Sequence, residues 1–208
     1  RDAIQTAQVA REAGADALMV TPTFYYGASE DGTCEFYERI AALGLPVIVY
    51  NVVPGNQVSP RLMERLIRID NVIGIKQSLG SSVDFVDMLD VGNGENAVLA
   101  AHDAVLIAEF LLGAVGSISA VLTVFPELFV ELWGAVNAGD VARARAIHER
   151  VLPIWRLIQG PYFPARLKAA LTLMGRAVGP ARHPMIAPSS DELSAIREAL
   201  HTGGFVPA

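Results

Sequence analysis

Five short apolar runs alternate with amphipathic stretches over the first 125 residues, and this alternation constrains the fold more than any other feature. The runs are too short for helices and favour β-branched residues, so we predict strands at 17–20, 47–50, 72–76, 97–100 and 115–120. Between the runs, apolar residues recur every three to four positions, which predicts helices at 3–12, 29–43, 59–69, 83–89 and 103–112. Strands separated by helices are joined by right-handed crossovers, so we expect a parallel α/β sheet.

The strand signal ends at Pro126, and the remaining residues predict helices at 127–138, 140–158, 164–174 and 190–201. Two architectures accommodate such a sheet: an open doubly wound sheet and a (β/α)8 barrel. No G-x-G-x-x-G motif follows a strand, so the sequence gives less support to the nucleotide-binding fold, an open doubly wound sheet. Polar residues at several strand ends favour the barrel, although five strands cannot close a barrel of eight.

Composition excludes several classes of function. A hydrophobic content of 52% indicates a large core, yet no uninterrupted apolar run reaches the ~18 residues of a membrane span. The net charge is −6 and no basic run exists, so we expect neither nucleic acid nor membrane as a partner. The single cysteine, Cys34, excludes an intrachain disulfide framework. We therefore expect a cytoplasmic protein.

Lys76 is the residue that most strongly suggests chemistry. The chain has only two lysines against fourteen arginines, and Lys76 ends the apolar run Val72–Lys76. A lysine at a strand end is usually solvated, with its stem lying along apolar surface. Unlike arginine, however, lysine can lose its proton once desolvated, and its amine is then a nucleophile toward carbonyls. The leading hypothesis is a Schiff-base enzyme with Lys76 as its amine.

Tyr50 is the expected partner of Lys76. Consecutive strands are expected to be neighbours about 5 Å apart, and both residues lie at the carboxyl end, where such sheets carry active sites. Gly74 shares a face with Lys76, and we expect it to leave room for the long side chain. A phenol beside an amine can shuttle protons while the amine condenses with a carbonyl. The alternative for Tyr50 is a core aromatic whose hydroxyl bonds to backbone.

Several segments together resemble one family, the pyruvate-dependent class I aldolases of the dihydrodipicolinate synthase and N-acetylneuraminate lyase superfamily. The resemblance rests on Tyr50-Asn51-Val52, Gly74-Ile75-Lys76, Val20-Thr21-Pro22 with Tyr25-Tyr26, Leu112-Gly113 with Gly116-Ser117-Ile118-Ser119, and Arg182-His183-Pro184-Met185. It implies a (β/α)8 TIM barrel with a C-terminal helical extension. Residues 1–125 would supply strands four to eight, and residues 126–208 the last barrel helix and the extension.

The resemblance also implies roles for individual residues. Lys76 would form an imine with pyruvate or a related 2-oxo acid, and Tyr50 would be the proton shuttle. Substrate-binding positions would be Asn51, Gly116, the main-chain carbonyl of Ile118, and Tyr25 or Tyr26, one of which is lent across a dimer interface. The implied protein is a homodimer or homotetramer that cleaves or condenses a 2-oxo acid with an aldehyde, as a carbon–carbon lyase or hydro-lyase. No metal and no organic cofactor is implied.

Two departures from the family pattern matter. The G-T-T-G-E motif is absent, so the chain is expected to lack the first three barrel strands. The segment Val53-Pro54-Gly55-Asn56-Gln57 contains no arginine. An arginine there would bind a second carboxylate, so its absence weakens the case for an acceptor aldehyde that carries one. The acceptor is therefore left open. Two other hypotheses stay open as well: a non-catalytic relative that binds a 2-oxo acid or an amino acid, and an inert fragment.

Overall fold

The computed structural model describes residues 2–207 and divides into two compact units. The first unit comprises Arg1–His102 and Glu109–Ile118, and the second comprises Asp103–Ala108 and Ser119–Ala208. The predicted boundary between barrel and extension at residues 125 and 126 follows the family architecture and stays a prediction.

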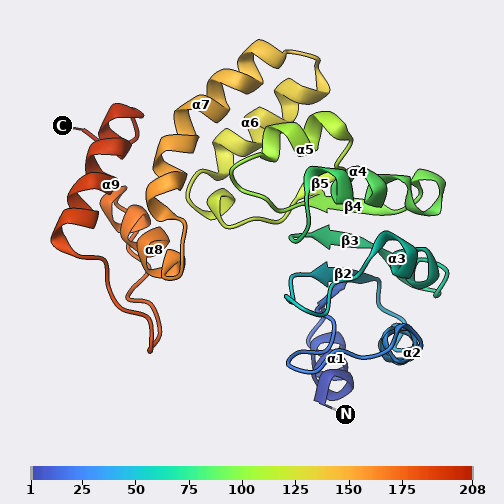
Figure 1. The fold of residues 1–208 in the computed structure, drawn as a ribbon. Coiled ribbons are helices and arrows are strands. Elements are labelled where there is room, and N and C mark those ends of the chain that lie inside the picture. The colour runs from blue at the N-terminus through green and yellow to red at the C-terminus, as the bar shows by residue number, and fades with distance from the viewer. Residues whose placement is uncertain (1, 208) are drawn as a thin grey trace. The chain divides into compact units, whose positions relative to one another are not determined.

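The first unit is built on a five-stranded parallel sheet, which confirms the predicted α/β class (Figure 1). The strands pair in chain order and comprise β1 (Leu18–Val20), β2 (Val47–Asn51), β3 (Val72–Gln77), β4 (Ala97–Ala100) and β5 (Gly116–Ser117). Strand β5 is shorter than the predicted 115–120 because its partner β4 ends at Ala100. The Ile118 N–H bonds to the Ala100 carbonyl at 3.1 Å, and the chain then turns into a 3-10 helix at Val121–Thr123.

Helices connect the strands as predicted. They are α1 (Asp2–Glu12), α2 (Glu30–Ala41), α3 (Pro60–Leu66), α4 (Ser82–Asp90) and α5 (Leu106–Leu112), with a 3-10 turn at Val91–Gly94. Ser29 and Ser59 are N-caps, because their side chains accept hydrogen bonds from the N–H groups of Gly32 and Leu62. Helix α5 begins three residues later than predicted because the side chain of Asp103 is hydrogen-bonded to residues 119 and 121, outside the helix. Its carboxylate accepts bonds from Ser119 Oγ and the Val121 N–H, each at 2.6 Å.

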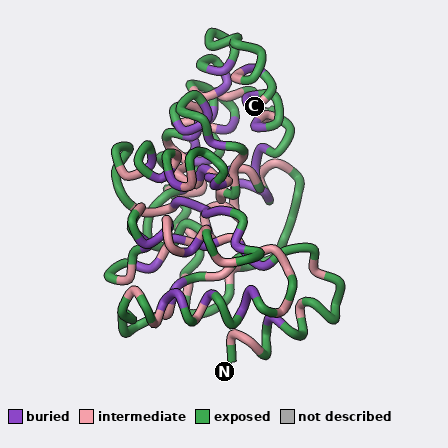
Figure 2. Tube along the Cα trace, turned by 90° about the vertical axis from the view of Figure 1, so that its right-hand side faces the viewer, coloured by how far each residue is buried: buried purple, intermediate pink, exposed green. Residues whose placement is uncertain are grey.

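The register of the sheet divides its side chains between two faces. Val49, Ile75 and Val98 form one row across β2, β3 and β4, and all three are fully buried. Residues one step along each strand occupy the other face: Tyr50 pairs with Lys76, and Lys76 pairs with Leu99. Figure 2 shows buried, intermediate and exposed stretches following one another along the chain. The first face holds the hydrophobic core, and the second carries Lys76.

The second unit is helical, as predicted. It contains α6 (Pro126–Asn137), α7 (Val141–Ile158), α8 (Phe163–Leu173) and α9 (Ser190–Thr202). Helix α7 packs against each of the other three, and its Ile154 and Ile158 are fully buried together with Leu132, Ile196 and Leu200. Arg166 on α8 donates through Nε to Glu192 on α9 at 3.0 Å. Within residues 2–207, no helix has the length and apolar character needed to cross a membrane.

Candidate active site

The structure brings Lys76 and Tyr50 together on one face of the sheet. They are register partners in β3 and β2, as the two-residue period of the strands predicted. Lys76 is only 8% exposed, and its Nζ lies 3.8 Å from the centroid of the Tyr50 ring. The amine therefore lies over the ring face, a contact that holds an ammonium group in place. No hydrogen bond of the Tyr50 hydroxyl to another described residue is seen, so the phenol is available to a group bound on the amine.

The expectation that Gly74 makes room for Lys76 is wrong. A Cβ at residue 74 would lie 2.2 Å from the carbonyl oxygen of Ala97, its register partner in β4. Glycine is required here because the two backbones approach closely. Gly74 therefore acts on Lys76 indirectly, by holding β3 and β4 in the register that places the lysine.

Asn51 lies next to Tyr50 in β2 but on the opposite face of the sheet. Its side chain is 1% exposed and exchanges two hydrogen bonds of 2.9 Å with the backbone of Val58. Its amide also donates to Gln77 Oε1 at 3.0 Å. The structure thus does not bring the Asn51 side chain to Lys76. Instead, Asn51 closes the loop of residues 52–57 that follows Tyr50, and this burial explains why a polar residue ends the strand.

The remaining predicted site residues divide into two groups. Gly116 pairs with Leu99, the register partner of Lys76, and Ile118 bonds to Ala100, so both lie at the same end of the sheet as the lysine. Tyr25 and Tyr26 lie in the loop after β1 and are 80% and 79% exposed, with their rings in edge contact. The structure does not bring these two tyrosines to Lys76.

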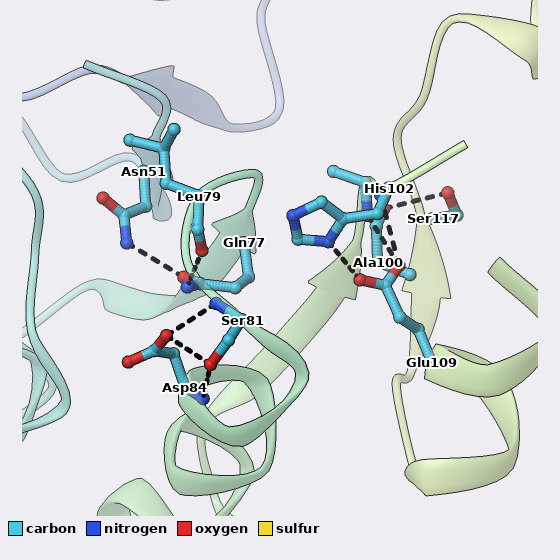
Figure 3. A network of polar contacts seen from close by, with 10 residues as sticks. Asn51, Gln77, Leu79, Ser81, Asp84, Ala100, His102, Glu109 and Ser117 are labelled. Carbon is cyan, nitrogen blue, oxygen red and sulfur yellow. Dashed lines mark hydrogen bonds and ion pairs between the residues drawn. The ribbon is translucent and has the colours of Figure 1, made fainter. Parts of the chain in front are cut away.

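Three polar residues, Gln77, Ser78 and Ser81, lie within five residues after Lys76 and have different surroundings. Figure 3 shows two of them, Gln77 and Ser81. Gln77 bonds to Asn51 and to the Leu79 carbonyl, which fixes the turn after β3. Ser81 caps α4 in a capping box with Asp84, and the hydrogen bonds from Ser81 lower the pKa of the Asp84 carboxyl. The Oγ of Ser78 is buried without a hydrogen-bond partner among the described residues. Ser78 lies two residues after Lys76, and a buried hydroxyl without a partner is rare in folded proteins.

Replacing Ser78 by alanine should therefore leave the protein as stable as before, or more stable by up to about 1 kcal/mol, since an unsatisfied hydroxyl contributes no bond. Ser81→Ala is the matched control, three residues away, and should lose about 1 kcal/mol because it removes an N-cap. Urea denaturation of the two variants measures both effects. Equal destabilisation by both substitutions would show that the Ser78 hydroxyl has a partner.

Glu109 is a buried charged residue at this end of the sheet that the sequence pattern did not single out. It lies on α5, is 3% exposed, and its Oε2 accepts bonds from the backbone N–H groups of Ala101 and His102, each at 3.2 Å. Its Oε1 bonds to Nδ1 of His102 (Figure 3). Only the seven-residue spacing between the two residues could have indicated the pair, and that spacing is common in helical segments. Among the described residues, no group of three His, Cys, Asp or Glu side chains is arranged to hold a metal ion.

Two further buried groups near the sheet are structural. Tyr37 on α2 donates its hydroxyl to the Val20 carbonyl at 2.9 Å, and burial raises the pKa of this phenol well above its ordinary value. Burial likewise raises the pKa of the Cys34 thiol, the effect of Arg65 being opposite and smaller. Both groups are therefore held in their neutral forms. Neither contacts Lys76, whose aromatic neighbour is Tyr50.

Comparison with known proteins places this chain in a family. The model of the dihydrodipicolinate synthetase family matches residues 1–202. The 4-hydroxy-tetrahydrodipicolinate synthase of Archaeoglobus fulgidus is 32% identical over 203 residues, which cover 96% of this chain and 70% of that protein. The enzyme of the same name from Methanothrix thermoacetophila is 33% identical over 204 residues, covering 96% and 69%.

Solved structures agree with the sequence comparison. Dihydrodipicolinate synthase from Thermotoga maritima superposes with a TM-score of 0.91 at 25% identity, covering 98% of this chain and 71% of that one. The synthase from Acinetobacter baumannii, solved in complex with pyruvate, gives a TM-score of 0.90 at 28% identity, with 98% and 71% covered. The fold is therefore that of the (β/α)8-barrel lyases, as predicted, and this chain spans about 70% of their length. The chain belongs to the dihydrodipicolinate synthetase family.

Proposed function

We propose that this chain is a class I aldolase or lyase that joins a 2-oxo acid to an aldehyde, or cleaves such an adduct, through an imine on Lys76. The observation that carries the proposal is the position of Lys76: a buried amine at the carboxyl end of β3, in contact with the phenol ring of Tyr50. The same arrangement of a nucleophile beside a proton carrier is typical of covalent catalysis.

The proposed steps use these two side chains. Nζ of Lys76 adds to the keto carbon of the 2-oxo acid and forms a carbinolamine. The Tyr50 hydroxyl donates a proton to the departing oxygen, water leaves, and the protonated imine remains. The Tyr50 phenolate takes a proton from C3, which gives an enamine and restores the phenol. The enamine adds to the aldehyde carbon, and the Tyr50 hydroxyl gives its proton to the aldehyde oxygen. Hydrolysis of the imine then releases the product and restores the amine.

The identity of the first substrate is supported by the relatives. Two relatives are named as synthases of 4-hydroxy-tetrahydrodipicolinate, and one solved relative was crystallised in complex with pyruvate. We therefore propose pyruvate or a close 2-oxo acid for this chain. We also propose a homodimer or homotetramer, because Phe24, Tyr25 and Tyr26 form a run of three aromatic rings that are each about four-fifths exposed.

Borohydride trapping tests the proposal. Incubation of the protein with pyruvate and sodium borohydride should add the mass of a reduced pyruvate imine, and peptide mapping should locate the addition at Lys76. Omission of pyruvate is the control for nonspecific reduction. If intact protein gains no mass, the aldolase proposal fails. Thermal stabilisation by pyruvate without any adduct would instead identify a non-catalytic binding relative.

A further inference from the structure

A cavity of about 850 Å³ lies in the second unit, between helix α8, helix α9 and the loop that joins them. Neither Lys76 nor Tyr50 lines it, so the proposed mechanism leaves it unused. Figure 1 shows the loop between the labels α8 and α9 as a long connection without helix or strand. Sites for small molecules have volumes of roughly 300–1,000 Å³, so this cavity is large enough for a small organic ligand.

One wall of the cavity is a single stripe of helix α8. The lining residues of this helix recur at the spacing of one helical face, namely Ala165, Lys168, Ala169, Thr172 and Leu173. The alanines at 165 and 169 have short side chains, which leaves space between the helix and the loop. Leu193 on α9 extends the same apolar surface. The wall formed by the helices is therefore mostly apolar.

The opposite wall is formed by residues 179–188 of the loop. Pro180 and Pro188 line the cavity, and the proline ring fixes φ of each at about −65°. Lys168 on α8 holds the loop in place, because its Nζ donates to the carbonyls of Val178 and Pro180 at 3.2 and 3.1 Å. A wall that is ordered before a ligand arrives lowers the entropy cost of binding.

The cavity carries positive charge in a chain whose net charge is −6. Lys168 and Arg182 both line it, and none of the described residues that line it is an aspartate or a glutamate. The Lys168 ammonium donates to carbonyls, which carry no net charge to offset its own. Arg182 is exposed and forms no hydrogen bond or ion pair with another described residue. Its guanidinium is thus available to a carboxylate, which arginine binds through two parallel hydrogen bonds.

We propose that this cavity binds a small carboxylate with an aliphatic chain. Arg182 binds the carboxylate, and the nearby Lys168 ammonium adds to the attraction. The chain lies along Ala169 and Leu173, where Met185 from the loop, a flexible side chain, adapts to its shape. A neutral molecule with the same chain lacks the first contact, and an inorganic anion lacks the second. The site is separate from Lys76 and does not depend on the proposed function.

Octanoate and 1-octanol are the probes for this site, because they share an aliphatic chain and differ in charge. Isothermal titration calorimetry with the 208-residue chain measures both affinities. We expect octanoate to bind about tenfold more tightly than 1-octanol, the effect of one hydrogen-bonded ion pair. Equal affinities for the two probes, or no binding of octanoate, would overturn the proposal.

Arg182→Gln tests the contact with the carboxylate. This variant should bind octanoate only about as tightly as 1-octanol, while its affinity for 1-octanol stays that of the wild-type protein. Arg197→Gln on α9 is the matched control, because it makes the same change in net charge at an exposed residue outside the cavity. It should keep the preference for octanoate. If both variants weaken octanoate binding equally, the anion is attracted by net charge alone and the site at Arg182 is refuted.

Ala169→Leu tests the position of the aliphatic chain. The three added carbon atoms extend into the space between helix and loop, so both probes should bind at least about tenfold more weakly. Circular dichroism checks that the helices are retained. Wild-type affinity for both probes in a folded Ala169→Leu variant would place the ligand elsewhere and would overturn the proposal. Borohydride trapping on Lys76 reads out the proposed function separately, so the two can fail independently.

Discussion

Replacing Lys76 by alanine or by arginine will lower the rate of pyruvate condensation by at least about 10³-fold, the loss expected when a covalent nucleophile is removed. Both variants will also fail to gain mass in borohydride trapping. The physical reason is that the imine requires an amine that can lose its proton, and neither alanine nor an arginine guanidinium provides one. Aldehyde-dependent consumption of pyruvate measures the rate, and mass spectrometry measures the adduct.

Lys76→Arg separates chemistry from folding. Arginine keeps a positive charge that can lie over the Tyr50 ring, so the packing of the lysine stem and the contact with the aromatic face are retained. The matched control is Lys168→Arg on α8. Lys168 is the only other lysine in the sequence, and its Nζ donates to the carbonyls of Val178 and Pro180 at 3.2 and 3.1 Å. Lys168→Arg should keep the pyruvate adduct on Lys76. An adduct in Lys76→Arg would show that another amine carries the chemistry.

The position of Lys76 beside Tyr50 could be predicted from the sequence because it depends on two short-range rules. Apolar runs with β-branched residues located the strands, and the two-residue period of a strand located the shared face. The pairing of consecutive strands then brought Tyr50 and Lys76 together, as the register confirms. None of these steps required knowledge of a side-chain contact.

The contacts that could not be predicted join residues on different elements of the fold, which sequence periodicity does not bring together. Glu109 reaches from α5 to the end of β4, and no periodicity indicates that a helix will direct a carboxylate at a strand end. Asn51 was predicted as a substrate-binding position. Its side chain bonds to the backbone of Val58 at the end of the loop after β2, whose path sequence patterns do not define. The role of Gly74 depends on how closely β4 approaches, which depends on the packing of the sheet as a whole.

Gly74→Ala is the substitution expected to damage the fold most. The new Cβ would meet the Ala97 carbonyl oxygen at 2.2 Å and the Ala97 Cβ at 2.8 Å. The obstacle is the backbone of a paired strand, so no side-chain rotation can relieve it, and we expect a loss of about 3 kcal/mol or more in the free energy of unfolding. Because Gly74–Ala97 and Lys76–Leu99 are successive pairs on one face, moving β4 away would also displace the wall beside the lysine.

Gly116→Ala in β5 is the matched control for this prediction. Its Cβ would lie 3.4 Å from Cδ2 of Leu99, the end of a flexible side chain that can move by a few tenths of an ångström. We therefore expect a change within about 1 kcal/mol, as for a tolerated increase in packing. Urea denaturation of both variants measures the difference. If both substitutions reduce the free energy of unfolding by the same amount, the close approach of β3 and β4 at Gly74 is not what holds the sheet in register. The position of Lys76 must then depend on contacts elsewhere in the sheet.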